Sequence, residues 1–179
     1  MRHPPPLIDP GICYGRLNMP IHPNADIDGL AQDPILNGST VVWTSPARRC
    51  RGLADRIASA LSVSLNADER LLELDFGGWE GKPWNEIPRA DLDRWAADPL
   101  AFKTLGGESG EELIARVEAF EIDLRQSGQD CAVVSHGGPL RVLSALLRRD
   151  SIDLLSAPQA LGTAVAITAA KAPVLPAEN

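Results

Sequence analysis

The clearest structural signal in the sequence is the run Cys131-Ala132-Val133-Val134-Ser135-His136-Gly137-Gly138. Residues 131–135 form a short, mostly apolar run, which is typical of a buried strand, and the two glycines after it indicate a turn. The turn is followed by apolar side chains at helical spacing, namely Leu140, Leu143 and Leu147. The run therefore predicts a buried strand that leads through His136 into a helix.

A second unit of the same kind lies earlier in the chain. Val41–Thr44 predicts a short buried strand, and Ser45-Pro46 predicts a helix start with serine as the N-cap. The helix carries an apolar stripe at Leu53, Ile57 and Leu61. Because strands alternate with helices, we expect an α/β fold with a mainly parallel sheet. Residues just beyond the carboxyl ends of such strands form the functional site.

The remaining elements complete a single domain. We predict strands at Leu71–Leu74 and Ala164–Thr168, and helices over Trp84–Ala97 and Gly110–Gln126. A chain of 179 residues can bury a sizeable core, and no repeat or low-complexity linker divides it. We therefore expect residues 1–179 to form one domain.

Composition narrows the class of protein. A net charge of −7 argues against a nucleic-acid or membrane surface as partner, although a small anionic substrate needs only a local basic pocket. We see neither a secretory signal nor an apolar run that could cross a bilayer. The three cysteines form no Cys-x-x-Cys motif, which favours reduced thiols, and no ligand cluster has zinc-site spacing. We expect a cytoplasmic protein.

Several residue types suited to a phosphate monoester stand at strand ends or in loops. Arginine forks can bind the non-bridging oxygens, and histidines can act as nucleophile, acid or hydrogen-bond donor. Glycines at a helix start let backbone N–H groups approach an anion, and a carboxyl group can protonate a leaving group. Taken singly, the Arg2-His3 pair, Arg49 and Glu73 are more typical of a solvated surface, whereas His136 is a better candidate because it follows a buried strand. The candidates are Arg2, His3, Arg49, Glu73, His136 and Gly137-Gly138.

The order of the segments is more specific than any one of them. Five segments occur in the order found in the histidine phosphatase superfamily, which includes the phosphoglycerate mutases, and they span nearly the whole chain. They are Arg2-His3, Thr44-Ser45-Pro46-Ala47-Arg48-Arg49-Cys50, Glu73-Leu74-Asp75-Phe76-Gly77-Gly78-Trp79-Glu80-Gly81, Gly106-Gly107-Glu108-Ser109 and Val133-Val134-Ser135-His136-Gly137-Gly138. The chain therefore resembles this superfamily.

The resemblance implies a role for each core residue. His3 matches the histidine that accepts the phosphoryl group, and Arg2 matches the phosphate-binding arginine beside it. In the pattern Ser-Pro-Leu-x-Arg, the functional arginine falls on Arg49 rather than Arg48. Glu73 matches the proton donor, and His136, with Gly137 beside it, matches the second phosphate-holding histidine. The implied fold is a three-layer α/β/α sandwich of the phosphoglycerate mutase-like kind, and no metal or cofactor is required.

Finer features resemble the alpha-ribazole phosphatases, which dephosphorylate an intermediate in building the lower loop of cobalamin. This likeness is carried by three segments together, namely Gly11-Ile12-Cys13-Tyr14-Gly15-Arg16, Phe76-Gly77-Gly78-Trp79-Glu80-Gly81 and Gly107-Glu108-Ser109. The resemblance predicts Arg16, Asn18 and Glu108 as substrate-binding residues. A broad-specificity or phosphoprotein phosphatase stays open, as does a catalytically weak member that binds a phosphorylated ligand. A homodimer is also left open.

The sequence departs from the family pattern in three places. Pro4 follows His3 where relatives carry glycine, which removes a backbone donor and stiffens the loop. Asn18 stands where many relatives have aspartate. Relatives also have an apolar strand before the Arg-His pair, whereas only Met1 precedes Arg2 here. We therefore expect His3 to lack its usual anchor, and about five to eight apolar residues to belong upstream.

Overall fold

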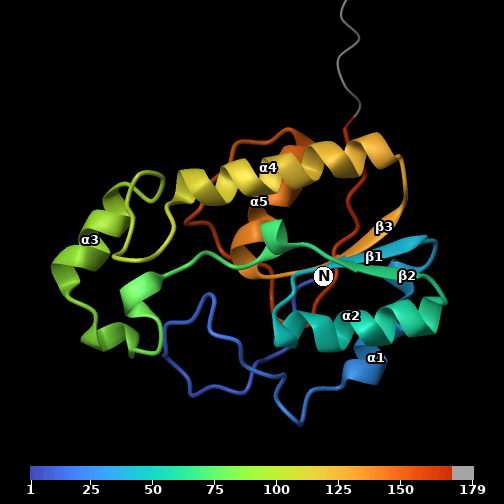
Figure 1. Cartoon of the computed structure of the whole chain (residues 1–179), viewed down its shortest axis with the longest axis horizontal. Coiled ribbons are helices and arrows are strands. Elements are labelled where there is room, and N and C mark those ends of the chain that lie inside the picture. Colours follow the sequence, from blue (N-terminus) through green and yellow to red (C-terminus); the bar gives the residue numbers. More distant parts are fainter. Residues whose placement is uncertain (171–179) are drawn as a thin grey trace, which may run out of the picture.

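The computed structural model describes residues 1–170 and shows three layers (Figure 1). The middle layer is a parallel sheet with the strand order β2-β1-β3. Its strands are β1 (Val41–Thr44), β2 (Ser64–Ala67) and β3 (Cys131–Val134). One face is covered by α1 (Ile27–Ala31) and α2 (Arg48–Leu61), and the other by α4 (Gly110–Ser127) and α5 (Gly137–Arg148). The expected three-layer α/β/α sandwich is confirmed.

Side chains alternate along each strand, so the strands contribute to the apolar cores on both faces of the sheet. Val42 of β1 points into the core beside α1 and α2, whereas its neighbour Trp43 points toward α4 and α5. In β3, Ala132 and Val134 join the first core and Val133 joins the second. Successive side chains of a strand point to opposite faces, so these short apolar runs are buried on both sides.

The helix starts differ in how they are capped. α4 begins with a capping box, in which the Ser109 hydroxyl accepts from the Glu112 N–H and the Glu112 carboxylate accepts from the Ser109 N–H. The prediction that Ser45 caps the next helix is wrong, because α2 begins at Arg48 with Ala47 at the N-cap position. The Ser45 hydroxyl contacts His136 instead.

One strand prediction fails around residues 64–74, and one strand there was missed. Leu71–Leu74 is not a strand, because the Asp68 carboxylate accepts from the Arg70 N–H and caps a 3-10 helix over Glu69–Leu71. The actual strand is β2, which sequence reasoning missed. It is an edge strand with mostly exposed side chains, so it lacks the apolar signal of a buried strand.

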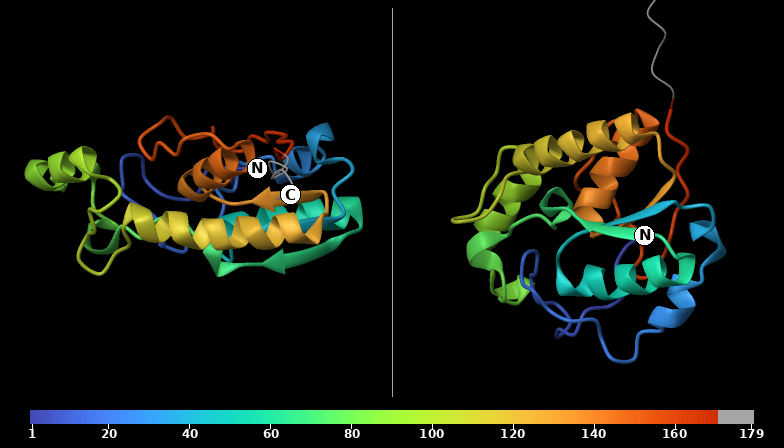
Figure 2. Two further views of the ribbon diagram at one scale, coloured as in Figure 1. Left: turned by 90° about the horizontal axis from the view of Figure 1, so that it is seen from above. Right: turned by 45° about the vertical axis from the view of Figure 1, so that its right-hand side comes forward.

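The helix predicted over Trp84–Ala97 is broken into two pieces. A 3-10 helix covers Trp84–Glu86, and α3 (Arg89–Ala97) follows, with Pro88 at its N-cap position. Proline lacks an N–H and disfavours helical geometry in the residue before it, which explains the break at Ile87. The helix predicted over Gly110–Gln126 is confirmed as α4. Together with neighbouring loops, α3 lies at one end of the molecule, beyond the sheet (Figure 2).

The first three residues continue the sheet past the end of β3. Arg2 forms a parallel bridge with Ser135, the His3 N–H donates to the Ser135 carbonyl (3.0 Å), and the Arg2 N–H donates to the Thr163 carbonyl (3.0 Å). The backbone of His3 is thus anchored, contrary to the expectation from sequence. The upstream apolar residues stay a prediction.

The strand predicted at Ala164–Thr168 is absent from the part of the chain that the structure describes. Only the residues just before it, Gly162 and Thr163, hydrogen-bond to the N-terminal segment. Within residues 1–170, no helix is long and apolar enough to cross a membrane.

Candidate active site

The carboxyl ends of β1 and β3 bring the predicted residues together. His136 follows β3 directly, Arg49 lies in the first turn of α2 after β1, and His3 is tied to Ser135 beside them. The His3 and His136 rings meet edge to face with centroids 5.1 Å apart, and the Arg49 Nε lies 3.4 Å from the His3 Nε2. Glu73 lies in the segment after Leu71, and its carboxylate reaches the same site by accepting a hydrogen bond from the Gly138 N–H.

Hydrogen bonding fixes the proton on the imidazole of His3. Its Nδ1 lies 2.7 Å from the carbonyl oxygen of Pro4. A carbonyl can only accept, so Nδ1 carries the hydrogen and Nε2 keeps its lone pair. The proline that departs from the family pattern therefore supplies the acceptor that orients the ring.

Burial keeps both histidines neutral. The pKa of His3 is lowered from 6.5 to about 3, mainly by burial and also by the guanidinium charges of Arg49 and Arg2, while the hydrogen bond to Pro4 acts in the opposite direction. The pKa of His136 is also held well below its ordinary value, by burial and then by the charge of Arg49. A neutral imidazole with a lone pair on Nε2, which here faces the Nε–H of Arg49, is the form of histidine that can act as a nucleophile.

Arg49 is fully buried and is held in place by the loop across from it. Its Nη1 donates to the Leu17 carbonyl (2.7 Å) and its Nη2 to the Gly15 carbonyl (2.6 Å). The guanidinium also lies over the Tyr14 ring, 5.4 Å from the centroid. This arrangement aims the Arg49 Nε at the Nε2 of His3.

Arg2 and the start of α5 complete the charged part of the site. The Nη1 of Arg2 donates to the Gln159 carbonyl (2.6 Å), and its buried Nε has no hydrogen-bond partner in the described residues. A Cβ on Gly137 would lie 3.4 Å from the Arg2 guanidinium carbon, so this group lies in van der Waals range of the helix start. A guanidinium beside a helix N-terminus favours an anion there.

The carboxylate of Glu73 is oriented by backbone N–H groups. The Gly138 N–H donates to both carboxylate oxygens (3.1 and 3.3 Å), and the Leu74 N–H donates to Oε1 (3.0 Å). The Glu73 carbonyl accepts from Arg16 Nε and Arg116 Nη2, both at 3.1 Å. Both the side chain and the backbone of Glu73 are therefore fixed.

The predicted substrate-binding residues are engaged in contacts within the protein. Arg16 and Arg116 both pair with the Glu108 carboxylate, at 3.4 and 2.6 Å. The Asn18 side chain accepts from the Arg48 N–H at the start of α2 (2.8 Å). Arg16 and Glu108 thus support the loop of Glu73, and their contact with a substrate stays a prediction.

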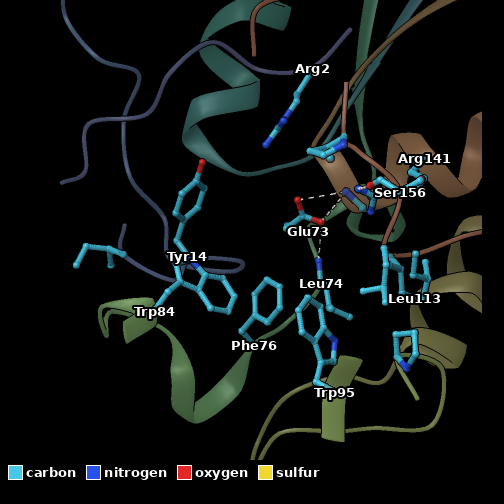
Figure 3. A pocket seen from close by; sticks show the side chains of 17 residues that line it. Arg2, Tyr14, Glu73, Leu74, Phe76, Trp84, Trp95, Leu113, Arg141 and Ser156 are labelled. Atoms are coloured by element: carbon cyan, nitrogen blue, oxygen red, sulfur yellow. Dashed lines mark hydrogen bonds between the residues drawn. The ribbon is translucent and has the colours of Figure 1, made fainter. Parts of the chain in front are cut away.

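A pocket of about 460 Å³ opens in front of these groups (Figure 3). Arg2, Glu73, Gly137 and Gly138 line one part of it, while His3, Arg49 and His136 are buried behind that lining. Its remaining wall is largely apolar and aromatic, and includes Ile12, Tyr14, Phe76, Trp84, Trp95, Leu113 and Leu154.

Three residues near the site were missed from the sequence. Arg141 lines the pocket from the first turns of α5, and its buried Nε has no hydrogen-bond partner in the described residues. Tyr14 lines the pocket beside Arg49, and Arg116 holds the carbonyls of Arg70 and Glu73. Arg141 could have been predicted, because it lies four residues after Gly137 and therefore on the same face of the helix. No local pattern marks the other two.

Two neutral imidazoles, two arginines and a helix N-terminus at the carboxyl edge of a parallel sheet define a site for a tetrahedral oxyanion. Comparison with known proteins gives the family. Residues 24–170 match the model of the histidine phosphatase superfamily, branch 1, and the chain belongs to that superfamily. It is a phosphoric monoester hydrolase. The matched range does not include Arg2 or His3, so their roles rest on the resemblance of sequence and on the geometry above.

Individual relatives carry different substrate names. Phosphoserine phosphatase 1 of Hydrogenobacter thermophilus is 32% identical over 123 residues, which cover 66% of this chain and 58% of that protein. Two solved structures share the fold. The alpha-ribazole phosphatase of Shigella flexneri gives a TM-score of 0.80 at 22% identity over 90% of this chain and 85% of that one. A mycobacterial glucosyl-3-phosphoglycerate phosphatase gives 0.73 at 23%, over 84% and 78%.

Proposed function

We propose that this protein hydrolyses phosphate monoesters through a covalent phosphohistidine on the Nε2 of His3. The observation that carries the proposal is the hydrogen bond from Nδ1 to the Pro4 carbonyl, which leaves Nε2 unprotonated. Burial and neighbouring arginines keep that imidazole neutral by lowering its pKa to about 3. The nucleophile is thus prepared before a substrate binds.

In the first step, Nε2 forms a bond to phosphorus as the ester P–O bond breaks. The electron pair leaves on the ester oxygen, which takes a proton from the Glu73 carboxyl group. Charge on the remaining phosphoryl oxygens is stabilised by Arg2, by the Nε of Arg49 and by His136 at the start of α5. These groups already surround His3, so little reorganisation is needed.

In the second step, water attacks the phosphorus of phosphohistidine and gives its proton to Glu73. The N–P bond breaks, the electron pair returns to Nε2 of His3, and inorganic phosphate leaves. Glu73 therefore acts first as an acid and then as a base, which restores the starting state. Its carboxylate lines the pocket, where both the leaving group and the water have access.

For the substrate, we propose a small phosphorylated metabolite such as alpha-ribazole 5′-phosphate. The segment from Gly11 to Arg16 supports this choice through its resemblance to alpha-ribazole phosphatases. A pocket of about 460 Å³ is of the size that small ligands occupy. Broad-specificity or phosphoprotein hydrolysis is the alternative within the same chemistry.

The second candidate is a protein that binds a phosphorylated ligand with little turnover. One observation favours it: the carbonyls of Leu17 and Gly15 take two of the five N–H donors of Arg49 and its Nε–H is directed at His3, which leaves one N–H on each Nη for a phosphoryl group. This candidate predicts binding of phosphate esters without their hydrolysis.

Turnover of p-nitrophenyl phosphate separates the two candidates. We expect hydrolysis, and brief incubation with a ³²P-labelled ester followed by quenching in base should trap labelled protein whose label is lost in acid. Phosphate release with no base-stable, acid-labile intermediate would contradict the phosphohistidine. Binding without phosphate release would favour the second candidate.

A further inference from the structure

The pocket has two chemically different ends. At one end lie the guanidinium of Arg2, the carboxylate of Glu73 and the helix start at Gly138. At the other, Phe76, Trp84 and Trp95 turn their rings toward the cavity (Figure 3). Because the phosphoryl group must lie at the charged end, the rest of the substrate extends toward the rings.

The aromatic end is a fixed wall. The rings of Trp84 and Trp95 are nearly parallel, with an interplanar angle of 24° and centroids 6.4 Å apart. Phe76 meets both edge to face, at 5.6 and 6.1 Å. Behind them lies the buried Trp79, whose ring is 6.3 Å from each of the two indoles. Such interlocked rings keep their positions without a ligand.

The chemistry of this wall selects among leaving groups. A polar group such as the ammonium and carboxylate of serine would lose hydration against the rings and gain few hydrogen bonds. A flat apolar ring would instead bury its own surface together with the partly exposed faces of Trp84 and Trp95. The wall thus favours substrates with a ring at the end remote from phosphorus.

We propose that the wall formed by Phe76, Trp84 and Trp95 binds a flat apolar ring carried by the leaving group, and that this contact determines substrate choice. The proposal rests on the phosphatase function above and deepens it. Alpha-ribazole 5′-phosphate, a ribose 5-phosphate with a dimethylbenzimidazole ring, has such a group, whereas phosphoserine has none.

The test compares two esters that differ at the anomeric carbon of the ribose, where one carries the ring and the other a hydroxyl group. Alpha-ribazole 5′-phosphate and ribose 5-phosphate release the same type of primary hydroxyl group, so their leaving oxygens are matched. We expect kcat/KM to be at least about tenfold higher for the ester with the ring, since an aromatic contact and apolar burial together readily exceed that factor. In Trp84→Leu and Trp95→Leu, which keep an apolar side chain, this ratio should fall toward one.

Trp43→Leu is the matched control, because it makes the same change at a tryptophan that packs against Phe120 in the core and does not line the pocket. The wild-type ratio should persist in it, and circular dichroism confirms that each variant is folded. An equal kcat/KM for both esters in the wild type overturns the proposal, as does a ratio unchanged in both pocket variants. Turnover of p-nitrophenyl phosphate but of neither ribose ester overturns it while the phosphatase function stands. If none of the three esters is hydrolysed, the proposed phosphatase function is itself contradicted.

Discussion

The charged end of the pocket and its aromatic end are held in place by different forces. At the charged end, each side chain is fixed by backbone groups: His3 by the Pro4 carbonyl, Arg49 by the Gly15 carbonyl and Glu73 by the Gly138 N–H. At the aromatic end, rings are fixed by packing against one another around Trp79. Hydrogen bonds demand one geometry, whereas apolar packing tolerates swaps of similar volume.

This difference separates the reaction from its selectivity. Changes to the groups that contact the phosphoryl group should reduce turnover of every ester, because all of the esters share that group. Changes at the aromatic end should alter only which ester is preferred. The predictions below test the charged half of this comparison, from the largest expected effect to the smallest.

The largest effect is expected from His3→Ala. Removal of the nucleophile should lower kcat by roughly 10³-fold or more on every ester, because a covalent step has no substitute at this position. The measurement is phosphate release from p-nitrophenyl phosphate and from ribose 5-phosphate. His22→Ala is the control and should retain wild-type rates, since the His22 ring contacts the exposed Asn24 N–H rather than the groups around His3. A loss of activity confined to one ester would contradict the idea that the charged end serves every substrate.

Glu73→Gln should separate substrates by their leaving groups. An alkyl ester such as ribose 5-phosphate needs a proton on its departing oxygen, so its kcat should fall by about 10²- to 10⁴-fold. The p-nitrophenolate ion leaves without a proton, so that ester should lose much less. The exposed Glu118→Gln serves as the control. Equal losses on both esters would remove Glu73 from the role of acid.

Gly138→Ala tests whether the position of the carboxylate matters as much as its presence. A Cβ at residue 138 would collide with Oε1 of Glu73 and displace it. A misplacement of about 1 Å can cost about 10²-fold, so hydrolysis of ribose 5-phosphate should fall by that order. Gly78→Ala is the control, because its Cβ would meet only the Leu105 carbonyl oxygen, at 3.6 Å. Wild-type rates in Gly138→Ala would show that the carboxylate is not tightly positioned.

The buried imidazole of His3 should make folding stability depend on pH. Its pKa is about 3 in the folded protein and 6.5 in the unfolded chain, so between these values the unfolded chain binds the extra proton. Stability should therefore fall as the pH drops below 6.5, by up to about 1.4 kcal/mol per pH unit for this group. Urea unfolding of the wild type and of His3→Gln at pH 7 and pH 5 measures it. The variant should show the smaller dependence, and identical dependences would contradict the assignment.

The smallest effect is expected from metal removal. The charge of the phosphoryl group is met by the fixed guanidinium groups of Arg2 and Arg49, so incubation with EDTA should leave kcat unchanged. The assay follows p-nitrophenyl phosphate before and after dialysis against the chelator. Loss of activity that added magnesium restores would contradict the proposed scheme.

The parts of the fold that were predicted correctly are those with strong local patterns. β1, β3, α4 and α5 combine short apolar runs with helical stripes, and both strands are buried on two faces. β2 was missed because its exposed residues are held by pairing with β1 rather than by burial. Leu71–Leu74 has the apolar composition of a strand, yet Asp68 caps a 3-10 helix there. The secondary structure of such segments depends on tertiary contacts, which the sequence shows only indirectly.

For the site, sequence reasoning located the residues that the structure gathers around His3, and it did so through the order of the motifs. Arg116 was not found, because its role is to donate to the carbonyls of Arg70 and Glu73, which no residue pattern specifies. The aromatic wall was not found either, since Trp84 and Trp95 meet only after the break at Pro88. The order of the motifs therefore identified the candidate catalytic residues, whereas the aromatic wall depends on packing that spacing along the chain does not reveal.

The contact between His3 and the Pro4 carbonyl also determines the regiochemistry of the proposed intermediate. Because the pros nitrogen (Nδ1) donates its hydrogen to a carbonyl oxygen, only the tele nitrogen (Nε2) can form the bond to phosphorus. The trapped enzyme should therefore contain one positional isomer of phosphohistidine. Antibodies that discriminate between the two isomers would recognise the tele form alone, and this gives the enzyme a chemical signature that is independent of its substrate.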